Sequence, residues 1–406
     1  MKILTGGITS PKGFQATGSY IGIKKRRKDL AILYSEVSAV AAAVFTTNVV
    51  KAAPVLWNKE IIDKKGTVRA IVTNSGNANA CTGEIGIKHA EEMAEILANC
   101  LKVKKEEVFV CSTGVIGVPL PMDIITKGIE QTYTNLSDRS DAARNAAEAI
   151  LTTDTFVKEI AVEIKINGKP VRIAGMAKGS GMIHPNMATM LGFITTDINI
   201  SRDLLEKALR EDVDDTYNMI SVDGDTSTND SVLLLANGLA GNKLITQEDE
   251  SYVLFSKALH YVNEYLAQQI IRDGEGATKF LEVKIKGALS KVDARKLGKS
   301  VITSNLVKTA FFGEDANWGR VLAAMGYSGA NFDPSKVHIE FMSPAGSVVI
   351  MKDGRPVKFD EDQATSVLKE REIRILITLQ EGQAEACAWG CDLSYEYVRI
   401  NGEYRT

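Results

Sequence analysis

The chain has 406 residues, 45% of them hydrophobic, and its 48 basic and 51 acidic residues leave a formal net charge of −3. This length exceeds what one hydrophobic core normally serves, so we expect two lobes or one large layered body. Neither sign of charge forms a long run, which argues against a nucleic-acid-binding or membrane-surface protein and favours a small-molecule substrate.

The first residues do not resemble a targeting segment. One lysine and three apolar residues precede Thr5, far short of the apolar region of a secretory signal. The longest uncharged apolar stretch, residues 37–50, is too short to span a bilayer. We therefore expect a soluble protein of the cytoplasm that makes no contact with membrane or nucleic acid.

The chain has five cysteines, an odd and scattered set that does not suggest a disulfide framework. The CAWGC pair lacks zinc-ligand spacing and has no histidine nearby. We expect reduced thiols, mostly buried, at Cys81, Cys100, Cys111, Cys387 and Cys391.

In the first part of the chain, apolar runs alternate with a small-residue loop and a helical pattern. Residues 69–73 (RAIVT) predict a buried strand that enters the loop 74–83, and a helix follows over 84–101. His89 falls on the apolar stripe of that helix, so we interpret it as a packed residue without a catalytic role. The next apolar strand then enters a loop that is typical of a functional site.

That strand covers residues 108–111, and the loop after it carries Thr113 and Gly114. Alternating strand and helix patterns continue without a repeat or a linker, which predicts an α/β or α+β fold. Further helices are expected at 123–135, 141–151, 203–217, 248–271, 293–311 and 320–325, strands at 337–341, 348–352 and 373–379, and Asn-Gly or Asp-Gly hairpins at 167–168 and 353–354.

Histidine chemistry has few candidates, because the chain holds only four histidines. His260 lies in a helical pattern and His338 in a strand, which leaves His184 in the small-residue segment 178–193 (KGSGMIHPNMATMLGF). No convincing G-x-S-x-G nucleophile elbow follows a strand. A Ser-His-Asp or Cys-His triad is therefore disfavoured.

An N-terminal nucleophile avoids the need for histidine. A threonine at a chain start uses its own α-amine, whose reference pKa is about 7.7 to 8.0, as the base for its hydroxyl. An internal threonine gains such an amine only when the peptide bond before it is cut. The same hydroxyl can make that cut by attacking the preceding carbonyl to give an ester that water opens.

An ordered set of motifs carries a family resemblance. The motifs are CSTGVIG, TTDT, HPNMATMLGF, DGDTSTND, GEGATK, NWGR and INGEYRT, spread over about residues 74–406. Each is weak alone, but in this order they resemble the ornithine acetyltransferase (glutamate N-acetyltransferase) family of arginine biosynthesis. The resemblance implies a layered sheet-and-helix sandwich of the N-terminal-nucleophile type with a smaller second lobe.

The resemblance further implies self-cleavage between Ala188 and Thr189. An alpha chain (1–188) and a beta chain (189–406) would stay associated in one body, and two copies of each would form a heterotetramer. Thr189 would take the acetyl group of N2-acetyl-L-ornithine as an ester and pass it to L-glutamate. Some relatives of this kind also take acetyl-CoA as donor, and the sequence leaves that second activity open.

Other site residues follow from the same resemblance. Thr113 and Gly114 correspond to the oxyanion hole, where donors are commonly the largest catalytic contribution. We assign a carboxylate partner to Lys178 and an ammonium partner to Glu275, since both substrates are zwitterions. The complete set of implied substrate contacts is Thr152 (or its neighbours Thr153 and Thr155), Lys178, Thr189, Glu275, Asn401 and Thr406.

Three other functions compete with this interpretation. An N-terminal-nucleophile aminopeptidase or amidohydrolase would give the acyl group to water, a kinase-like protein would bind nucleotide, and a non-catalytic binding protein would stay uncut. KGSG and GEGATK lack the P-loop spacing that the kinase needs. The acidic run 223–230 fits no calcium loop, because Thr228 replaces the glycine and Leu234 the glutamate. We expect no metal and no cofactor.

Overall fold

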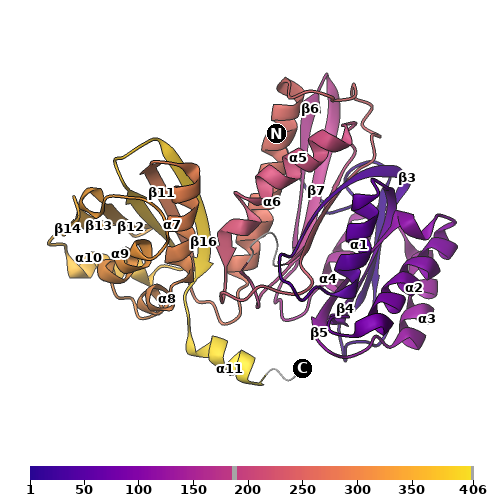
Figure 1. The fold of residues 1–406 in the computed structure, drawn as a ribbon, viewed down its shortest axis with the longest axis horizontal. Coiled ribbons are helices and arrows are strands. Elements are labelled where there is room, and N and C mark those ends of the chain that lie inside the picture. The colour runs from indigo at the N-terminus through magenta and orange to yellow at the C-terminus, as the bar shows by residue number, and fades with distance from the viewer. Residues whose placement is uncertain (185–189, 404–406) are drawn as a thin grey trace.

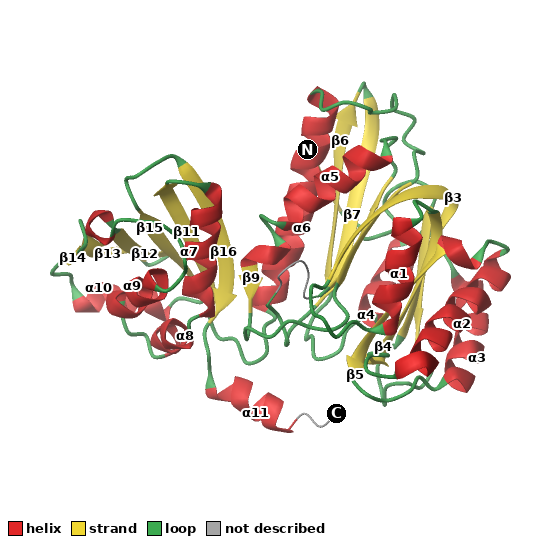
Figure 2. Ribbon diagram, viewed as in Figure 1, coloured by secondary structure: helices red, strands yellow, loops and turns green. Residues whose placement is uncertain are grey.

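The structure is a computed structural model, and it describes residues 1–184 and 190–403. These residues form two lobes, one on a nine-stranded sheet and a smaller one on a seven-stranded sheet (Figure 1). Helices cover the sheets of both lobes (Figure 2). The layered α/β class with a smaller second lobe, predicted from the sequence, is confirmed.

The larger lobe holds the strands of the first half of the chain and one strand of the second half. They are β1 (Lys2–Leu4), β2 (Phe14–Ser19), β3 (Leu30–Phe45), β4 (Thr67–Asn77), β5 (Val108–Val115), β6 (Lys158–Ile166), β7 (Lys169–Lys178), β8 (Leu191–Thr196) and β10 (Ser231–Ala236). Their order is β1-β6-β7-β8-β10-β3-β4-β5, and β2 also pairs with β3.

Strand β3 belongs to two layers at once. Its first part pairs with β2 and β4, its last part pairs with β10, and the pairing register with β4 shifts between Tyr34 and Ala39. A register shift lets a strand bend, and Figure 2 shows β3 arching from the side of β7 to the side of β4. The sheet therefore folds over into two facing layers.

The helices of this lobe are α1 (Ala53–Asp63), α2 (Gly83–Leu101), α3 (Met122–Thr132), α4 (Ser140–Ala149), α5 (Arg202–Val213) and α6 (Glu250–Arg272). Alternation along the strands directs side chains to different cores. Ala31 and Leu33 of β3 share the inner core with Leu233 of β10, whereas Ile32 packs in the core that contains α2 residues and Leu234 in the core that contains α6 residues.

The smaller lobe consists of β9, which precedes α6, and of the elements that follow α6. Its strand order is β14-β13-β12-β15-β11-β16-β9, and helix α7 packs on β11 and β16. The elements are β9 (Ile220–Ser221), β11 (Phe280–Ala288), α7 (Lys291–Thr303), α8 (Asn305–Phe312), α9 (Trp318–Gly326), β12 (His338–Ser343), β13 (Gly346–Lys352), β14 (Arg355–Pro356), α10 (Glu361–Lys369), β15 (Glu372–Thr378), β16 (Ala384–Cys391) and α11 (Tyr395–Glu403).

Both predicted hairpins are confirmed. Asn167 and Gly168 join β6 to β7 with φ values of 49° and 75°, and Asp353 and Gly354 join β13 to β14 with 47° and 70°. Two positive φ values are what a tight hairpin turn with the correct twist requires. The first of these hairpins directs β7 back toward Lys178.

Three predictions about local structure are wrong. The helix expected over 293–311 is two helices, because extended Ser304 ends α7 and caps α8 through Val307 N. The apolar stripe of α2 is shorter than expected, since Ile85 is exposed and His89 half-buried. All five cysteines are free thiols, but only Cys111 and Cys391 are buried.

Candidate active site

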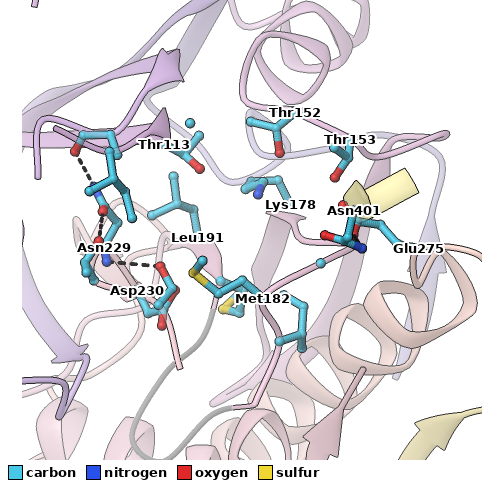
Figure 3. Close-up of a pocket in the computed structure, with 18 residues that line it drawn as sticks. Thr113, Thr152, Thr153, Lys178, Met182, Leu191, Asn229, Asp230, Glu275 and Asn401 are labelled. Carbon is cyan, nitrogen blue, oxygen red and sulfur yellow. Dashed lines mark hydrogen bonds between the residues drawn. The ribbon is translucent and has the colours of Figure 1, made fainter. Parts of the chain in front are cut away.

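A cavity of about 200 Å³ opens where the two layers of the larger lobe meet the loops that lead to the smaller lobe. Its walls come from segments far apart in the sequence (Figure 3). The described residues that line it are Ala78, Thr113, Gly114, Ile116, Thr152, Thr153, Lys178, Gly181, Met182, Ile183, Met190, Leu191, Ser227, Thr228, Asn229, Asp230, Glu275 and Asn401.

Thr113 and Gly114 lie near the end of β5, paired with Ser75 and Gly76 of β4. The sequence predicts that both strands end earlier and that Thr113 and Gly114 lie in a loop. That prediction is wrong, because the parallel pairing continues through these small residues. Gly114 has φ 134°, and a side chain there would put its Cβ 2.3 Å from the Gly76 carbonyl carbon. Glycine is therefore required for the two strands to approach this closely.

The threonine run after α4 lies on the opposite wall. Thr152 and Thr153 line the cavity, and the Thr152 amide donates to Asp154 Oδ2 at 3.0 Å. Thr155 is not among the lining residues, and its amide donates to Asp273 Oδ2 at 3.0 Å instead. Of the three threonines considered from the sequence, the first two therefore face the cavity.

Lys178, the last residue of β7, lies beside the threonines in Figure 3. It is only 8% exposed, so its ammonium is enclosed by the cavity walls. Beneath it, buried Lys158 bridges Asp154 at 2.7 Å and Asp273 at 2.5 Å. Burial works to raise the pKa of Asp154, but Lys178 and Lys158 outweigh it and hold that pKa well below its usual value.

Glu275 and Asn401 form the far end of the cavity (Figure 3). Asn401 Nδ2 donates to Glu275 Oε2 at 2.9 Å, which joins helix α11 to the loop after α6. The Glu275 amide donates to the Ser180 carbonyl at 2.9 Å and fixes that loop next to Lys178. A residue near the C-terminus thus reaches the same cavity as residues of the first sheet.

Asn229 and Asp230, which sequence analysis did not select, also line the cavity. Asn229 Nδ2 donates to the carbonyls of Ala78 at 2.5 Å and Ser112 at 2.8 Å, tying the start of β10 to the ends of β4 and β5. Asp230 is 3% exposed, and its Oδ2 has no hydrogen-bond partner within the described residues. Burial raises the pKa of Asp230 well above its ordinary value, despite Ser227 and Lys178.

Ala188, Thr189 and Thr406 lie outside the described residues. Met190, the residue after Thr189, lines the cavity, and its carbonyl accepts from the Ser231 amide at 2.9 Å. Leu191 then begins β8 opposite Lys178.

The sequence matches the ArgJ family over residues 15–406. The chain belongs to this family. An arginine biosynthesis bifunctional protein ArgJ of Caldanaerobacter subterraneus subsp. tengcongensis is 55% identical over 406 residues, which is 100% of both chains. Its namesake from Thermotoga neapolitana is 53% identical over 397 residues, 98% of this chain and 99% of its own.

A solved structure also resembles this ArgJ-family chain. It is the ornithine acetyltransferase of Mycobacterium tuberculosis complexed with ornithine, which is 40% identical, covers 46% of this chain and 99% of its own, and superposes with a TM-score of 0.43.

Histidine does not contribute to the cavity in the described part of this ArgJ-family chain, since none of the four histidines is among the lining residues. His184 Nδ1 lies 3.1 Å from Ser221 Oγ, and burial, helped by Lys299, lowers the pKa of His184 to about 4. His260 instead pairs with Asp212 at 2.6 Å.

Within residues 1–184 and 190–403, no group of three or more His, Cys, Asp or Glu side chains is arranged to hold a metal ion. In the same ranges, none of the helices combines the length and the apolar character that crossing a bilayer needs.

Proposed function

We propose that this ArgJ-family chain transfers the acetyl group of N2-acetyl-L-ornithine to L-glutamate in arginine biosynthesis, through an acetyl ester on Thr189. Family membership over residues 15–406 is the observation that carries this proposal. The curated relatives are named bifunctional, so a second donor, acetyl-CoA, is included in it. The protein works in the cytoplasm on small molecules.

The nucleophile arises by cleavage between Ala188 and Thr189, which gives the chains 1–188 and 189–406. The freed α-amine of Thr189 then serves as the base for its hydroxyl. Pairing of β7 with β8 over six residue pairs, from 173–178 to 191–196, supports continued association of the two chains. Two such pairs of chains make up the proposed heterotetramer.

Acetyl transfer takes place in two steps. The Thr189 oxygen attacks the acetyl carbonyl, the oxyanion is stabilised by the Thr113 hydroxyl and the Gly114 amide, and ornithine leaves with the proton on its amine. The amine of glutamate then attacks the ester, an amide bond forms, and the threonine hydroxyl is restored. The position of Met190 in the cavity wall supports a reaction at this place.

Substrate recognition relies on enclosed charges. Lys178 pairs with the substrate carboxylate, and Glu275, held by Asn401, receives the side-chain ammonium of ornithine. Thr152 and Thr406 complete the contacts. Burial raises the pKa of Asp230, which reduces the repulsion between this carboxyl and an anionic substrate. Neither a metal nor a cofactor is needed for these steps.

Acceptor dependence tests this proposal against the hydrolase alternative. Purified protein is incubated with N-acetylornithine, and both ornithine and free acetate are measured with and without glutamate. We expect ornithine release to depend on glutamate and to equal the N-acetylglutamate formed, with little acetate. Equal acetate release in both samples would show that water is the acceptor and would overturn the proposal.

A further inference from the structure

The longest basic run of the chain lies at the edge of the cavity. Five consecutive cations, Lys24 to Lys28, form most of the loop 21–28 between β2 and β3, hereafter the basic loop, so the expectation that neither sign of charge forms a long run is wrong for this loop. The proposed transfer from N-acetylornithine to glutamate involves amino acids alone and leaves these side chains without a role. Their arrangement suggests a second kind of ligand.

A buried carboxylate shapes the basic loop. Asp29 is 0% exposed and accepts hydrogen bonds from the amides of Ile21 at 2.7 Å, Gly22 at 3.2 Å and Lys24 at 2.8 Å. Three bonds to one carboxylate hold the loop backbone in a defined form before any ligand arrives. Preorganisation of this kind lowers the entropic cost of binding.

Two contacts attach the basic loop to opposite walls of the cavity. Lys24 packs on Gly76, where an added Cβ would lie 2.9 Å from Lys24 Cγ, and Gly76 is the strand partner of the lining residue Gly114. Arg27 Nη1 donates to the carbonyls of the lining residue Thr152 at 3.4 Å and of Asp154 at 3.0 Å. The loop therefore spans from the Gly114 wall to the threonine wall.

The charges of the basic loop are unequally neutralised. Lys28 pairs with Glu148 at 2.8 Å, and Lys24 Nζ donates to the Leu151 carbonyl at 2.8 Å. Among the described residues, Lys25, Arg26 and Arg27 have no carboxylate within ion-pair distance. Burial lowers the pKa of Lys24 to about 8, against the pull of Asp29, and Arg27 and Lys178 lower it further. Positive charge is thus concentrated at this edge of the cavity.

We propose that the basic loop binds the phosphate groups of a nucleotide-linked thioester donor such as acetyl-CoA, whose acyl end reaches Thr113 and Gly114. This inference rests on the proposed function, and it names the part of the chain that serves the second donor. Arginine is suited to phosphate, because its planar donors form paired hydrogen bonds with phosphate oxygens. N-acetylornithine carries no phosphate and makes no use of the loop.

The donor step balances without any other reactant. The nucleophile oxygen attacks the thioester carbonyl, an ester C–O bond forms, the C–S bond breaks, and the thiol leaves with the proton of the hydroxyl. Glutamate then takes the acetyl group as it does in the other reaction. Only the leaving group differs, so the loop affects binding of the thioester and leaves the second step unchanged.

A double variant, Lys25→Ala with Arg26→Ala, tests the inference in the full-length protein. Both side chains belong to the basic loop, and neither donates to a described cavity residue. We expect KM for acetyl-CoA to rise roughly tenfold, since 1.4 kcal/mol of lost binding is a factor of ten, while kcat/KM for N-acetylornithine stays unchanged. The matched control is Lys352→Ala with Lys358→Ala, two exposed lysines of the smaller lobe, which leaves both donors unaffected.

A donor without phosphate gives the second readout. S-acetylpantetheine keeps the thioester and lacks the nucleotide, so wild type and double variant should have the same KM for it. Added salt should raise the KM for acetyl-CoA in the wild-type protein only. An equal KM for acetyl-CoA in both proteins, or an equal loss with both donors, would overturn the inference. Wild-type protein that uses N-acetylornithine but not acetyl-CoA would also overturn it, together with the second donor, and leave the proposed transfer from N-acetylornithine to glutamate intact.

Discussion

At the scale of single residues, two buried carboxyls of the site have pKa values that are shifted in opposite directions. Asp154 accepts from Lys158 at 2.7 Å and from the Gly179 amide at 2.7 Å, and its pKa is held low. Asp230 has an oxygen without a partner in the described part of the chain, and burial keeps its pKa high. The environment therefore shifts the pKa values of the two carboxyls in opposite directions.

The raised pKa of Asp230 predicts how stability depends on pH. Since the folded pKa lies above the unfolded value of about 3.9, the stabilisation is present below that value and is lost as pH rises. Asp230→Asn stays neutral at every pH. The unfolding free energy of the variant minus that of wild type should therefore increase by up to about 1.4 kcal/mol for each pH unit above pH 4. Urea unfolding between pH 4 and pH 8 measures this difference.

Asp225→Asn is the control for that series, because Asp225 is an exposed residue of the same segment. It should follow wild type across the range. A constant difference between Asp230→Asn and wild type from pH 4 to pH 8 would mean that Asp230 is ionised in the folded protein.

At the scale of elements, strands β4 and β5 show where sequence patterns mislead. The small residues after Thr73 and Cys111 predict loops by composition, yet parallel pairing continues to Asn77 and Val115. Long-range pairing thus overrides local preference, as it also does for the alanine-rich end of β3. By contrast, the Asn-Gly and Asp-Gly hairpins could be predicted, because their turns depend on two adjacent residues alone.

Gly114→Ala tests the close approach of these strands. The variant combines a positive φ with a Cβ that meets backbone, so we expect a loss of about 2–4 kcal/mol of stability and no measurable acetyl transfer. Gly168→Ala is the control, because its φ is 75° but nothing lies within 4 Å of the added Cβ. It should lose only about 1 kcal/mol and keep full activity. Thermal unfolding and the acetyl-transfer assay separate the two, and a normally active Gly114→Ala would contradict the assignment.

At the scale of the molecule, the cavity brings together segments that are far apart in the sequence, and no local sequence pattern predicts that they meet. The family resemblance predicted six of the described residues that line the cavity, because the order of the motifs can be recognised without knowledge of the fold. These residues are Thr113, Gly114, Thr152, Lys178, Glu275 and Asn401. The bend of β3 and the contribution of Asn229 and Asp230 could not be predicted, since both depend on pairing between the two layers. Asp230 precedes the uncharged strand SVLLLA, a weak signal of burial.

Removal of helix α11 separates function from stability at this scale. The helix has no fully buried residues, and its contacts with the rest include the Phe312–Tyr395 ring pair at 5.4 Å and half-buried Tyr397, which packs against the main core. A chain that ends at Ser394 should therefore lose little in melting temperature but about 10- to 100-fold in kcat/KM through loss of Asn401. Asn401→Ala in the full chain should reproduce most of that loss. An unimpaired truncated protein would show that the tail takes no part in the site.

Intact-mass spectrometry tests the central claim most directly. Active wild-type protein should contain the chains 1–188 and 189–406, and N-acetylornithine without glutamate should add one acetyl group to the second chain. Glutamate should remove that group, and Thr189→Ala should remain one uncut chain of 44.0 kDa. A fully active wild-type protein that stays uncut, or a chain 189–406 that never carries acetyl, would contradict the account.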